Sequence, residues 1–324
     1  MAINRRDFLG GSAMMAAVGA ASGLGAAPSP KGKGRRKFVA ACPPSSREYG
    51  SRRPGPLRMM AIGAHPDDAD IQAGALTVKL VQEGAEVVFV SLTNGCMGHQ
   101  RLSPAETAAT RKRESQEAKR RFGLKDYIVL DNDDCHLEVT YENRVKVAKL
   151  IREFQPDFVI THRTCDYHVD HRATGTLVMD AGYLLGVPHW VPEAPAQRLR
   201  PVILYMRDSF TYPREIRPDV MLDAGPYLDK WCDGLDAQVS QFYDWLPWDK
   251  GTEKEVPDRT DIAARNAYII KFWAQRKIDD SKRFADAWHE QYPNRPLPKY
   301  MEAFEVSEYG RAPTEEDLKR LLGE

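Results

Sequence analysis

The chain has 324 residues, of which 42% are hydrophobic and 28% are charged, a composition typical of globular proteins. Lysine plus arginine and aspartate plus glutamate each number 46, so the formal net charge is zero. The global electrostatic field of such a chain does not draw it to nucleic acid or to an anionic membrane, and we expect neither as a partner.

Residues 1–27 are predicted to be an export signal. Residues 5–9, Arg-Arg-Asp-Phe-Leu, have the twin-arginine pattern, and a mildly apolar run rich in Ala and Gly follows over residues 12–27. This run is too short and too weakly apolar to be a membrane span. We therefore expect a periplasmic or extracellular protein with no stable membrane span after removal of the signal. Cys42 ends a box similar to a lipoprotein processing site, but the basic residues 35–37 separate it from the apolar run, so we discount its lipidation.

Residues 28–56 are rich in Pro, Gly, Ser and basic residues and are predicted to be a disordered linker. Residues 57–324 are predicted to form a single domain. Short apolar runs bounded by polar or turn residues are typical of buried parallel strands. They occur at residues 57–64, 86–93, 127–130, 157–162 and 202–206.

Helices are predicted between these strands. Ser103 and Glu106 form a capping box with Pro104 at the first helical position, so a helix should begin there and end near Phe122, before Gly123. A second helix face has the spacing i, i+3, i+4, i+7 at Val147, Leu150, Ile151 and Phe154. From about residue 249 we expect an accessory helical tail, with one long helical pattern near 262–288. The alternation of strands and helices predicts a doubly wound α/β domain.

Two polar clusters directly follow predicted strands. Residues 64–70, Ala-His-Pro-Asp-Asp-Ala-Asp, follow the first strand, and residues 166–171, Asp-Tyr-His-Val-Asp-His, follow the strand that ends at His162. Ligands of open α/β sheets bind outside the carboxyl ends of the strands. We therefore expect the two clusters to meet in one site.

The clusters contain the parts of a hydrolytic zinc site. His65 and Asp68 are three residues apart, and so are His168 and His171. Three His or carboxylate ligands with one position left for water are typical of catalytic zinc, which lowers the pKa of bound water to about 7. A neighbouring carboxylate can accept a proton, and a histidine can protonate a leaving group. Either cluster alone has a plain structural explanation, because Asp67 and Asp68 are also good helix caps. The spacing leaves open which histidine is the third ligand.

The two motifs resemble those of the PIG-L or LmbE-like family of zinc-dependent N-acetylglucosaminyl deacetylases. The family's A-H-P-D-D-x-[ED] motif is similar to residues 64–70, and its H-x-D-H motif is similar to residues 168–171. The resemblance extends from about residue 57 to residue 248. It implies a Rossmann-like fold with a mostly parallel sheet and helices on both faces. It also implies Zn²⁺-dependent removal of an N-acetyl or other N-acyl group from a small amino sugar or sugar conjugate.

The resemblance also implies roles for single residues. The zinc ligands would be His65, Asp68 and His171. Asp67 would be the general base, and His168 would stabilise the oxyanion and protonate the departing amine, with Asp170 holding its ring. Three departures from the family pattern bear on substrate choice: Asp70 in place of Glu, Cys96 in place of a frequent acid, and Gln238 in place of a frequent His.

Weaker substrate contacts are predicted at Asn94, Gly95 and Arg111. Asn94 and Gly95 follow the second predicted strand, where a plain turn would explain them equally well. Arg111 is three residues from Glu114 on a charged helix, a spacing more often found in surface pairs.

Two alternatives belong to other functional classes. Two histidines and one carboxylate also describe non-haem Fe(II) enzymes, but those triads usually lie on β-barrel scaffolds, and the base-like Asp67 fits hydrolysis better. A non-catalytic carbohydrate-binding protein could retain a structural metal, but such a site would be closed by a fourth protein ligand.

Overall fold

The computed structural model describes residues 54–323, whose strands form a seven-stranded sheet. The predicted export signal (1–27) and residues 28–53 of the predicted linker lie outside the described residues. The strands are β1 (Arg58–Gly63), β2 (Glu86–Thr93), β3 (Asp126–Asn132), β4 (Phe158–Thr161), β5 (Val202–Tyr205), β6 (Val220–Asp223) and β7 (Met301–Val306). Their order is β3-β2-β1-β4-β5-β7-β6. Strands β1 to β5 run parallel to one another, whereas β7 is antiparallel to both of its neighbours.

Five of the ten described α-helices begin at a residue whose side chain accepts a hydrogen bond from a backbone N–H of the first turn. They are α1 (Asp68–Gln82), α2 (Pro104–Phe122), α3 (Tyr141–Phe154), α4 (Val169–Leu184), α5 (Leu228–Asp236), α6 (Leu246–Lys250), α7 (Ile262–Trp273), α8 (Gln275–Arg283), α9 (Ala285–Gln291) and α10 (Glu315–Leu322). The capping box predicted for α2 is confirmed, because the Ser103 N–H donates to the Glu106 carboxylate at 2.9 Å. Gly123 ends that helix in the left-handed conformation, with φ of 74°. Within residues 54–323, no helix is both long and apolar enough to cross a membrane.

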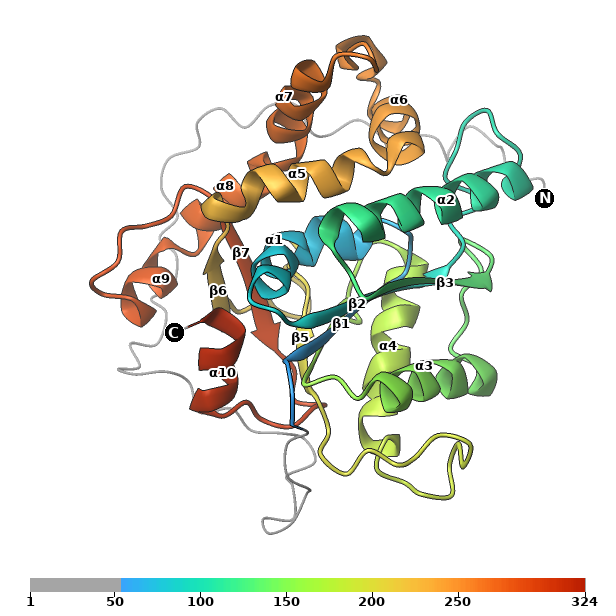
Figure 1. Ribbon diagram of the computed structural model, residues 1–324, viewed down its shortest axis with the longest axis vertical. Coiled ribbons are helices and arrows are strands. Elements are labelled where there is room, and N and C mark those ends of the chain that lie inside the picture. The colour runs from blue at the N-terminus through green and yellow to red at the C-terminus, as the bar shows by residue number, and fades with distance from the viewer. Residues whose placement is uncertain (1–53, 324) are drawn as a thin grey trace, which may run out of the picture. The chain divides into compact units, whose positions relative to one another are not determined.

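Alternation along the strands divides the core into two layers. In β1, Met59 and Ala61 belong to the apolar cluster on one face of the sheet, and Met60 and Ile62 belong to the cluster on the other. Helices α1, α2 and α5 cover the first face, and α3 and α4 cover the second (Figure 1). Strands buried on both faces have nearly continuous apolar sequences, which is why the five predicted strands are confirmed as β1 to β5. The predicted doubly wound α/β fold with a mostly parallel sheet is also confirmed.

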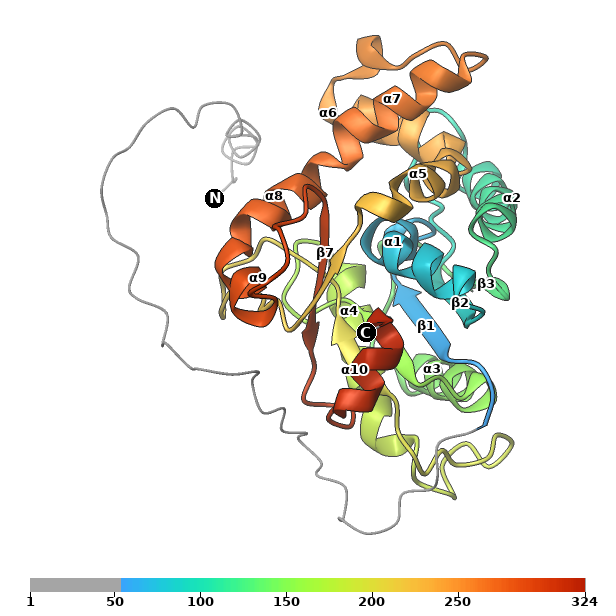
Figure 2. The ribbon, with the colours of Figure 1, turned by 60° about the vertical axis from the view of Figure 1, so that its left-hand side comes forward.

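The C-terminal stretch contains a strand as well as helices. The long helical pattern near 262–288 is divided into α7, α8 and the start of α9, and β7 follows with α8 beside it (Figure 2). β7 lies between β5 and β6, so this stretch completes the sheet. The sequence analysis missed β7 because Glu302 and Glu305 interrupt its apolar pattern, although both side chains are buried.

Glu302 is buried because three donors satisfy its carboxylate. It accepts hydrogen bonds from the backbone N–H groups of Ala75 and Leu76, at 2.9 and 2.8 Å, in the interior of α1. It also pairs with the ammonium group of Lys277 on α8, which lies 4.3 Å from the centre of the Trp231 ring. Lys277 and Glu302 each have only 4% of their surface exposed. The pair therefore connects β7, α1 and α8.

Replacing Glu302 by Gln is expected to destabilise the protein by about 3–5 kcal/mol, because it leaves the Lys277 ammonium buried without a counter-ion. The urea midpoint of unfolding measures this loss. The control is the double variant E302Q/K277M, which removes both charges and should recover much of the stability. An E302Q protein with an unchanged midpoint would show that the ion pair contributes nothing.

Candidate metal centre

The two polar motifs meet where the strand order changes direction. β1 lies beside β4, which places the residues after β1 next to those between β4 and α4. This is the switch point at which open α/β sheets bind ligands. The Nδ1 atom of His65 lies 3.2 Å from the Nε2 atom of His171, so the expectation that the clusters meet is confirmed.

The carboxylate of Asp68 presents one of its oxygens to a metal. Its Oδ2 atom accepts hydrogen bonds from the backbone N–H groups of Ala64 and His65, at 2.9 and 2.8 Å. The Nε2 atom of His162 lies 3.1 Å from the same oxygen. The other oxygen, Oδ1, lies 3.3 Å from His171 Nε2. Because Oδ2 is already saturated, Oδ1 is the atom left for coordination.

Carboxylates fix the tautomers of His65 and His171. The Nε2 atom of His65 lies 3.1 Å from Asp134 and 3.3 Å from Asp170, so its proton belongs on Nε2 and the lone pair on Nδ1. The Nδ1 atom of His171 lies 3.0 Å from Asp166, which leaves the lone pair on Nε2. A carboxylate that holds the remote nitrogen of a histidine is the usual arrangement around zinc ligands.

The donor atoms fit a zinc ion. Zinc bonds to nitrogen and oxygen are about 2.0–2.2 Å long, so two ligand atoms at tetrahedral positions lie about 3.3–3.6 Å apart. The separations of His171 Nε2 from His65 Nδ1 and from Asp68 Oδ1 are 3.2 and 3.3 Å. Three overlapping groups of donors have all their ligand atoms within 4.8 Å of one another: His65 with His168 and His171, His65 with Asp134, His168 and Asp170, and Asp68 with His162 and His171.

His168 is less suited than His171 to be a ligand. The Nδ1 atom of its ring accepts a hydrogen bond from the backbone N–H of Asp170 at 3.2 Å, which caps the start of α4. In the neutral ring the proton is therefore on Nε2, which has no lone pair for a metal. This geometry favours His171 as the third ligand and leaves His168 as a hydrogen-bond donor beside it.

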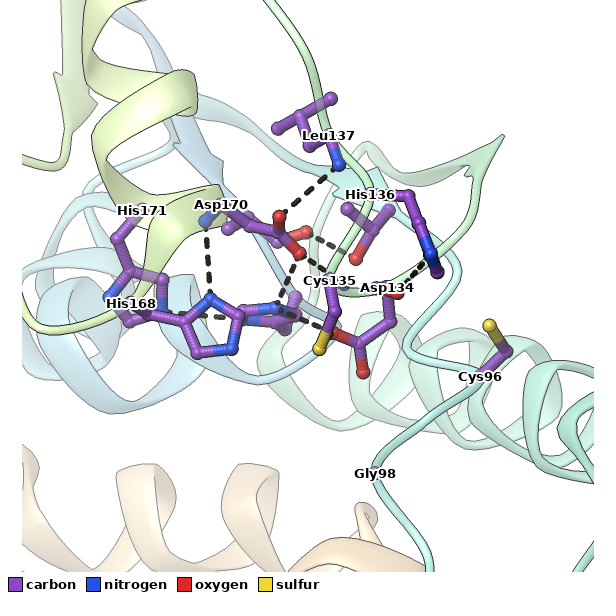
Figure 3. A network of polar contacts seen from close by, with 12 residues as sticks. Cys96, Gly98, Asp134, Cys135, His136, Leu137, His168, Asp170 and His171 are labelled. Carbon is purple, nitrogen blue, oxygen red and sulfur yellow. Dashed lines mark hydrogen bonds and ion pairs between the residues drawn. The ribbon is translucent and has the colours of Figure 1, made fainter. Parts of the chain in front are cut away.

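The structure corrects the role expected for Asp170. Its carboxylate accepts hydrogen bonds from the N–H groups of Cys135 and Leu137, at 2.7 and 3.2 Å, in the loop after β3 (Figure 3). It also contacts His65, as described above. Among the described residues, the carboxylate forms no hydrogen bond with the ring of His168, to which the backbone N–H of Asp170 donates instead. Asp170 is therefore a positioning residue for His65.

Asp67 is held in a buried polar chain beside the donor atoms. Its carboxylate accepts a hydrogen bond from the amide of Gln241, and the amide oxygen of Gln241 accepts one from the guanidinium of Arg111. Burial and the neighbouring Asp68 carboxylate raise the pKa of Asp67 above its ordinary value. A raised pKa makes this carboxylate a stronger base than an exposed one.

Arg111 belongs to this series of buried hydrogen bonds and does not form an exposed surface pair with Glu114. Its side chain is buried, and it also donates to the backbone carbonyl of Gly98 at 2.9 Å. Glu114 likewise points inward and accepts hydrogen bonds from the backbone and hydroxyl groups of Ser240, at 2.8 and 2.6 Å. The Nη2 atom of Arg111 thus donates to two protein acceptors, whereas its buried Nε atom has no hydrogen-bond partner among the described residues, and the side chain lines part of the cleft.

The donor atoms lie in a cleft of about 510 Å³. Its walls come from the loops after β1, β4 and β5, from the π-helical segment η3 (Ser240–Trp245), and from α7 and α8. A cleft of this size suits a sugar-sized ligand. The sequence analysis missed several residues of the site: His162, Asp134, Asp166 and Gln241. A signal existed for Asp166, which is part of the second motif, and for His162, which ends the predicted strand before it.

The family model for PIG-L, described as GlcNAc-PI de-N-acetylase, matches residues 60–182, which include both motifs. The chain is thus similar to the PIG-L family over these residues. A diacetylchitobiose deacetylase of Thermococcus kodakarensis is 32% identical over 138 residues, which cover 41% of this chain and 52% of that protein. The match therefore spans about half the length of that relative. A mycothiol S-conjugate amidase of Streptomyces coelicolor is 25% identical over 244 residues, covering 66% of this chain and 79% of that protein.

Solved structures share the fold of this chain. An N,N'-diacetylchitobiose deacetylase from Pyrococcus horikoshii matches with a TM-score of 0.60 and 23% identity, covering 78% of this chain and 84% of that chain. GalB, the 4-carboxy-2-hydroxymuconate hydratase of Pseudomonas putida, matches with a TM-score of 0.59 and 18% identity, covering 80% and 98%. Because a deacetylase and a hydratase share this fold, the chemistry has to be argued from the residues of the site.

Two of the departures from the PIG-L motif contact each other. The carboxylate of Asp70 accepts hydrogen bonds from the Tyr127 hydroxyl at 2.7 Å and from the Gln238 amide at 3.3 Å. Burial raises the pKa of Asp70 to about 7. Neither Asp70, Gln238 nor Cys96 lines the cleft, so among the described residues these departures lie behind the site and not on its substrate-facing wall.

The two substrate contacts predicted after β2 have different outcomes. Gly95 lines the cleft in the left-handed conformation, with φ of 68°, and a Cβ atom there would lie 3.0 Å from Pro66. Asn94 does not line it, because its amide donates to Asp133 at 3.1 Å and accepts from the Cys96 N–H at 3.0 Å. Asn94 is therefore a turn residue beside the cleft, and its role as a substrate contact stays a prediction.

Proposed function

We propose that the protein is a zinc-dependent hydrolase that removes an N-acetyl, or other N-acyl, group from an amino sugar or sugar conjugate. The observation that carries the proposal is the convergence of three donor atoms, from His65, Asp68 and His171, beside the buried base Asp67. The names of the relatives, a deacetylase and an amidase, support cleavage of an amide bond. The proposal extends the similarity to the family to an activity of this chain.

The residues of the chain divide the proton transfers between them. Zinc, when bound, polarises the amide carbonyl and lowers the pKa of water. Asp67, held by Gln241, accepts the proton of the attacking water. His168 acts in its protonated form, in which Nδ1 carries a proton and no longer accepts the Asp170 N–H. Its Nε2–H group donates to the oxygen that becomes negative and then gives that proton to the departing amine. Asp134 and Asp170 hold His65 in place, and Asp166 holds His171.

An Fe(II) enzyme and a protein that only binds carbohydrate are the two alternatives to zinc-dependent hydrolysis. The same two histidines and one carboxylate would also accept Fe(II), and a carbohydrate-binding protein would need no base. The polar chain from Arg111 through Gln241 to Asp67 supports hydrolysis, because it holds a carboxylate beside the donor atoms without committing it to an ion pair.

Metal removal is expected to abolish amine release from N-acetylated sugars, and zinc is expected to restore it. Fluorescamine labelling of the released amine measures the rate on a panel of N-acyl sugars. Fe(II), added without oxygen, is the control metal. No amine release from any sugar by the zinc-loaded protein would contradict the proposal, and restoration by Fe(II) alone would replace the proposed metal.

We propose further that residues 1–27 direct export by the twin-arginine route, which would place the mature protein outside the cytoplasm. Replacing both Arg5 and Arg6 by Lys is expected to leave the uncleaved precursor inside the cell. Cell fractionation followed by mass spectrometry of the N-terminus measures this. Replacing Lys31 and Lys33, which lie in the predicted linker, by Arg is the matched control. Normal export of the Arg5→Lys/Arg6→Lys variant would contradict the proposal.

A further inference from the structure

The π-helical segment η3 is joined to helix α2 by a carboxylate that takes no direct part in the proposed hydrolysis. Glu114, on α2, accepts hydrogen bonds from the backbone N–H and the hydroxyl group of Ser240, at 2.8 and 2.6 Å. Ser240 is buried and is the first residue of η3. Hydrogen bonds to an ionised carboxylate are stronger than those between neutral groups. Glu114 therefore fixes the start of η3 relative to α2.

The next residue of η3 makes the contact with the general base. The side-chain amide of Gln241 is buried, donates to the carboxylate of Asp67 and accepts from the guanidinium of Arg111. An amide that is bound at both its nitrogen and its oxygen has one orientation. The place of the Asp67 carboxylate thus depends on where η3 puts the backbone of Gln241.

A second carboxylate binds η3 beyond Gln241. The hydroxyl of Tyr243 donates at 2.5 Å to Asp236 on α5, and α5 lies beside α2 (Figure 1). Asp236 also accepts hydrogen bonds from Arg121 and Arg265, so its removal would disturb several elements at once. A π-helical turn is rare and occurs most often at functional sites, which fits a segment whose place is set by contacts from outside.

Glu114 is the more selective of the two contacts. Within residues 54–323, its hydrogen-bond donors are the two groups of Ser240 alone. Its removal therefore changes the support of η3 and breaks no other described hydrogen bond to that carboxylate. The path from Glu114 to the base then consists of Ser240, Gln241 and Asp67, with a hydrogen bond at each end.

We propose that Glu114 is a positioning residue for the general base: it binds Ser240, which fixes Gln241, and Gln241 fixes the carboxylate of Asp67. This inference rests on the proposed function, which gives Asp67 the role of base. It adds a residue that touches neither the substrate nor the donor atoms and that acts on the rate through two other side chains.

Kinetics of amine release give the first test. Glu114→Ala is expected to lower kcat by roughly 10- to 100-fold with KM little changed, because even a small misplacement of a catalytic group is costly. Glu114→Gln should keep most of the rate, since its amide can accept from the Ser240 N–H and donate to the Ser240 hydroxyl. The matched control is Glu117→Ala, one turn further along α2, where the side chain pairs with Arg120 and Arg121. The control should have the wild-type rate.

Two further backgrounds show whether the loss passes through Gln241 and Asp67. In Gln241→Ala and in Asp67→Asn, adding Glu114→Ala should cause little further loss of kcat, because groups that act on one step through each other are not additive. A general weakening of the fold would lower the rate by the same factor in every background. Zinc content and melting temperature are measured for each variant.

The side-chain amide signals of Gln241 report the positioning without turnover. In ¹⁵N-labelled, zinc-loaded protein these signals are identified by their absence from the spectrum of Gln241→Ala. We expect them to shift and to exchange faster with water in Glu114→Ala, as the hydrogen bond to Asp67 weakens. They should stay in place in Glu117→Ala.

The outcomes separate this inference from the proposed function. Unchanged Gln241 signals in Glu114→Ala, a Glu114→Gln rate as low as that of Glu114→Ala, or an equal loss in all backgrounds would each overturn Glu114 as a positioning residue, even if the wild-type protein hydrolyses N-acyl sugars. Conversely, Gln241 signals that depend on Glu114 in a protein that releases no amine from any sugar would support the path to Asp67 and overturn the hydrolase proposal.

Discussion

Replacing Asp67 by Asn is expected to lower kcat/KM by roughly 10²- to 10⁴-fold while the protein keeps its zinc, since this is the usual contribution of one general acid–base group. Asn has nearly the same shape and can still contact the Gln241 amide, but it cannot accept a proton from water. Initial rates of amine release and the metal content of the same preparation are the two measurements. The zinc should remain, because Asp67 is not one of the three proposed ligands.

The pH dependence provides the control for this variant. In the wild-type protein, kcat/KM should be bell-shaped, falling at low pH as the Asp67 and zinc-water pair is protonated and at high pH as His168 loses its proton. The acidic limb therefore reports the Asp67 and zinc-water pair together and not Asp67 alone. His168→Ala should flatten the basic limb. Near-normal activity of Asp67→Asn would show that the base is elsewhere.

Much of the site could be predicted because its residues are concentrated in two short motifs. His65, Asp67 and Asp68 directly follow a strand whose apolar sequence is unambiguous, and His168 and His171 follow another. The rule that ligands bind outside the carboxyl ends of parallel strands then placed both motifs at one edge of the sheet. The structure adds that β1 and β4 are neighbours, which brings the motifs into contact.

The remaining residues could not be predicted, because their roles depend on contacts between distant segments. Gln241 reaches Asp67 from the π-helical segment η3, and a glutamine has no sequence signal for such a contact. Asp134 is one of several acids after β3, and only the fold shows which of them faces His65. β7 could not be recognised because the partners that allow Glu302 to be buried, Lys277 and the N–H groups of α1, are remote in sequence.

The role of Asp170 shows the limit of carrying a motif over residue by residue. The residue is in the site, as predicted, but its carboxylate is hydrogen-bonded to His65 and to the loop after β3 and not to the ring of His168. Spacing along α4 fixes where the residue lies and does not fix where its side chain points. Hydrogen bonds to Cys135 and Leu137 determine that direction, and these residues are not part of either motif.

Zinc content should distinguish the roles of the two histidines of the second motif. His171→Ala is expected to lose zinc, because the Nε2 atom of His171 supplies one of the three proposed donors. His168→Ala is expected to keep zinc and to lose activity, because the Nδ1 atom of His168 already accepts the Asp170 N–H. Metal analysis after dialysis, together with amine release, distinguishes the two.

Asp134→Asn is expected to have a zinc affinity between those of the wild-type protein and His171→Ala. It leaves all three donors in place but weakens the hold on His65 Nε2, and a change of this kind typically costs about 10- to 100-fold in metal affinity. Zinc affinity, measured by competition with a chelator, should therefore decrease in the order wild type, Asp134→Asn, His171→Ala, with His168→Ala close to wild type. If His168→Ala loses zinc while His171→Ala keeps it, the third ligand is His168. The tautomers inferred from Asp166 and the Asp170 N–H would then have to be reversed, and the proton donor to the amine would have to be sought elsewhere in the cleft.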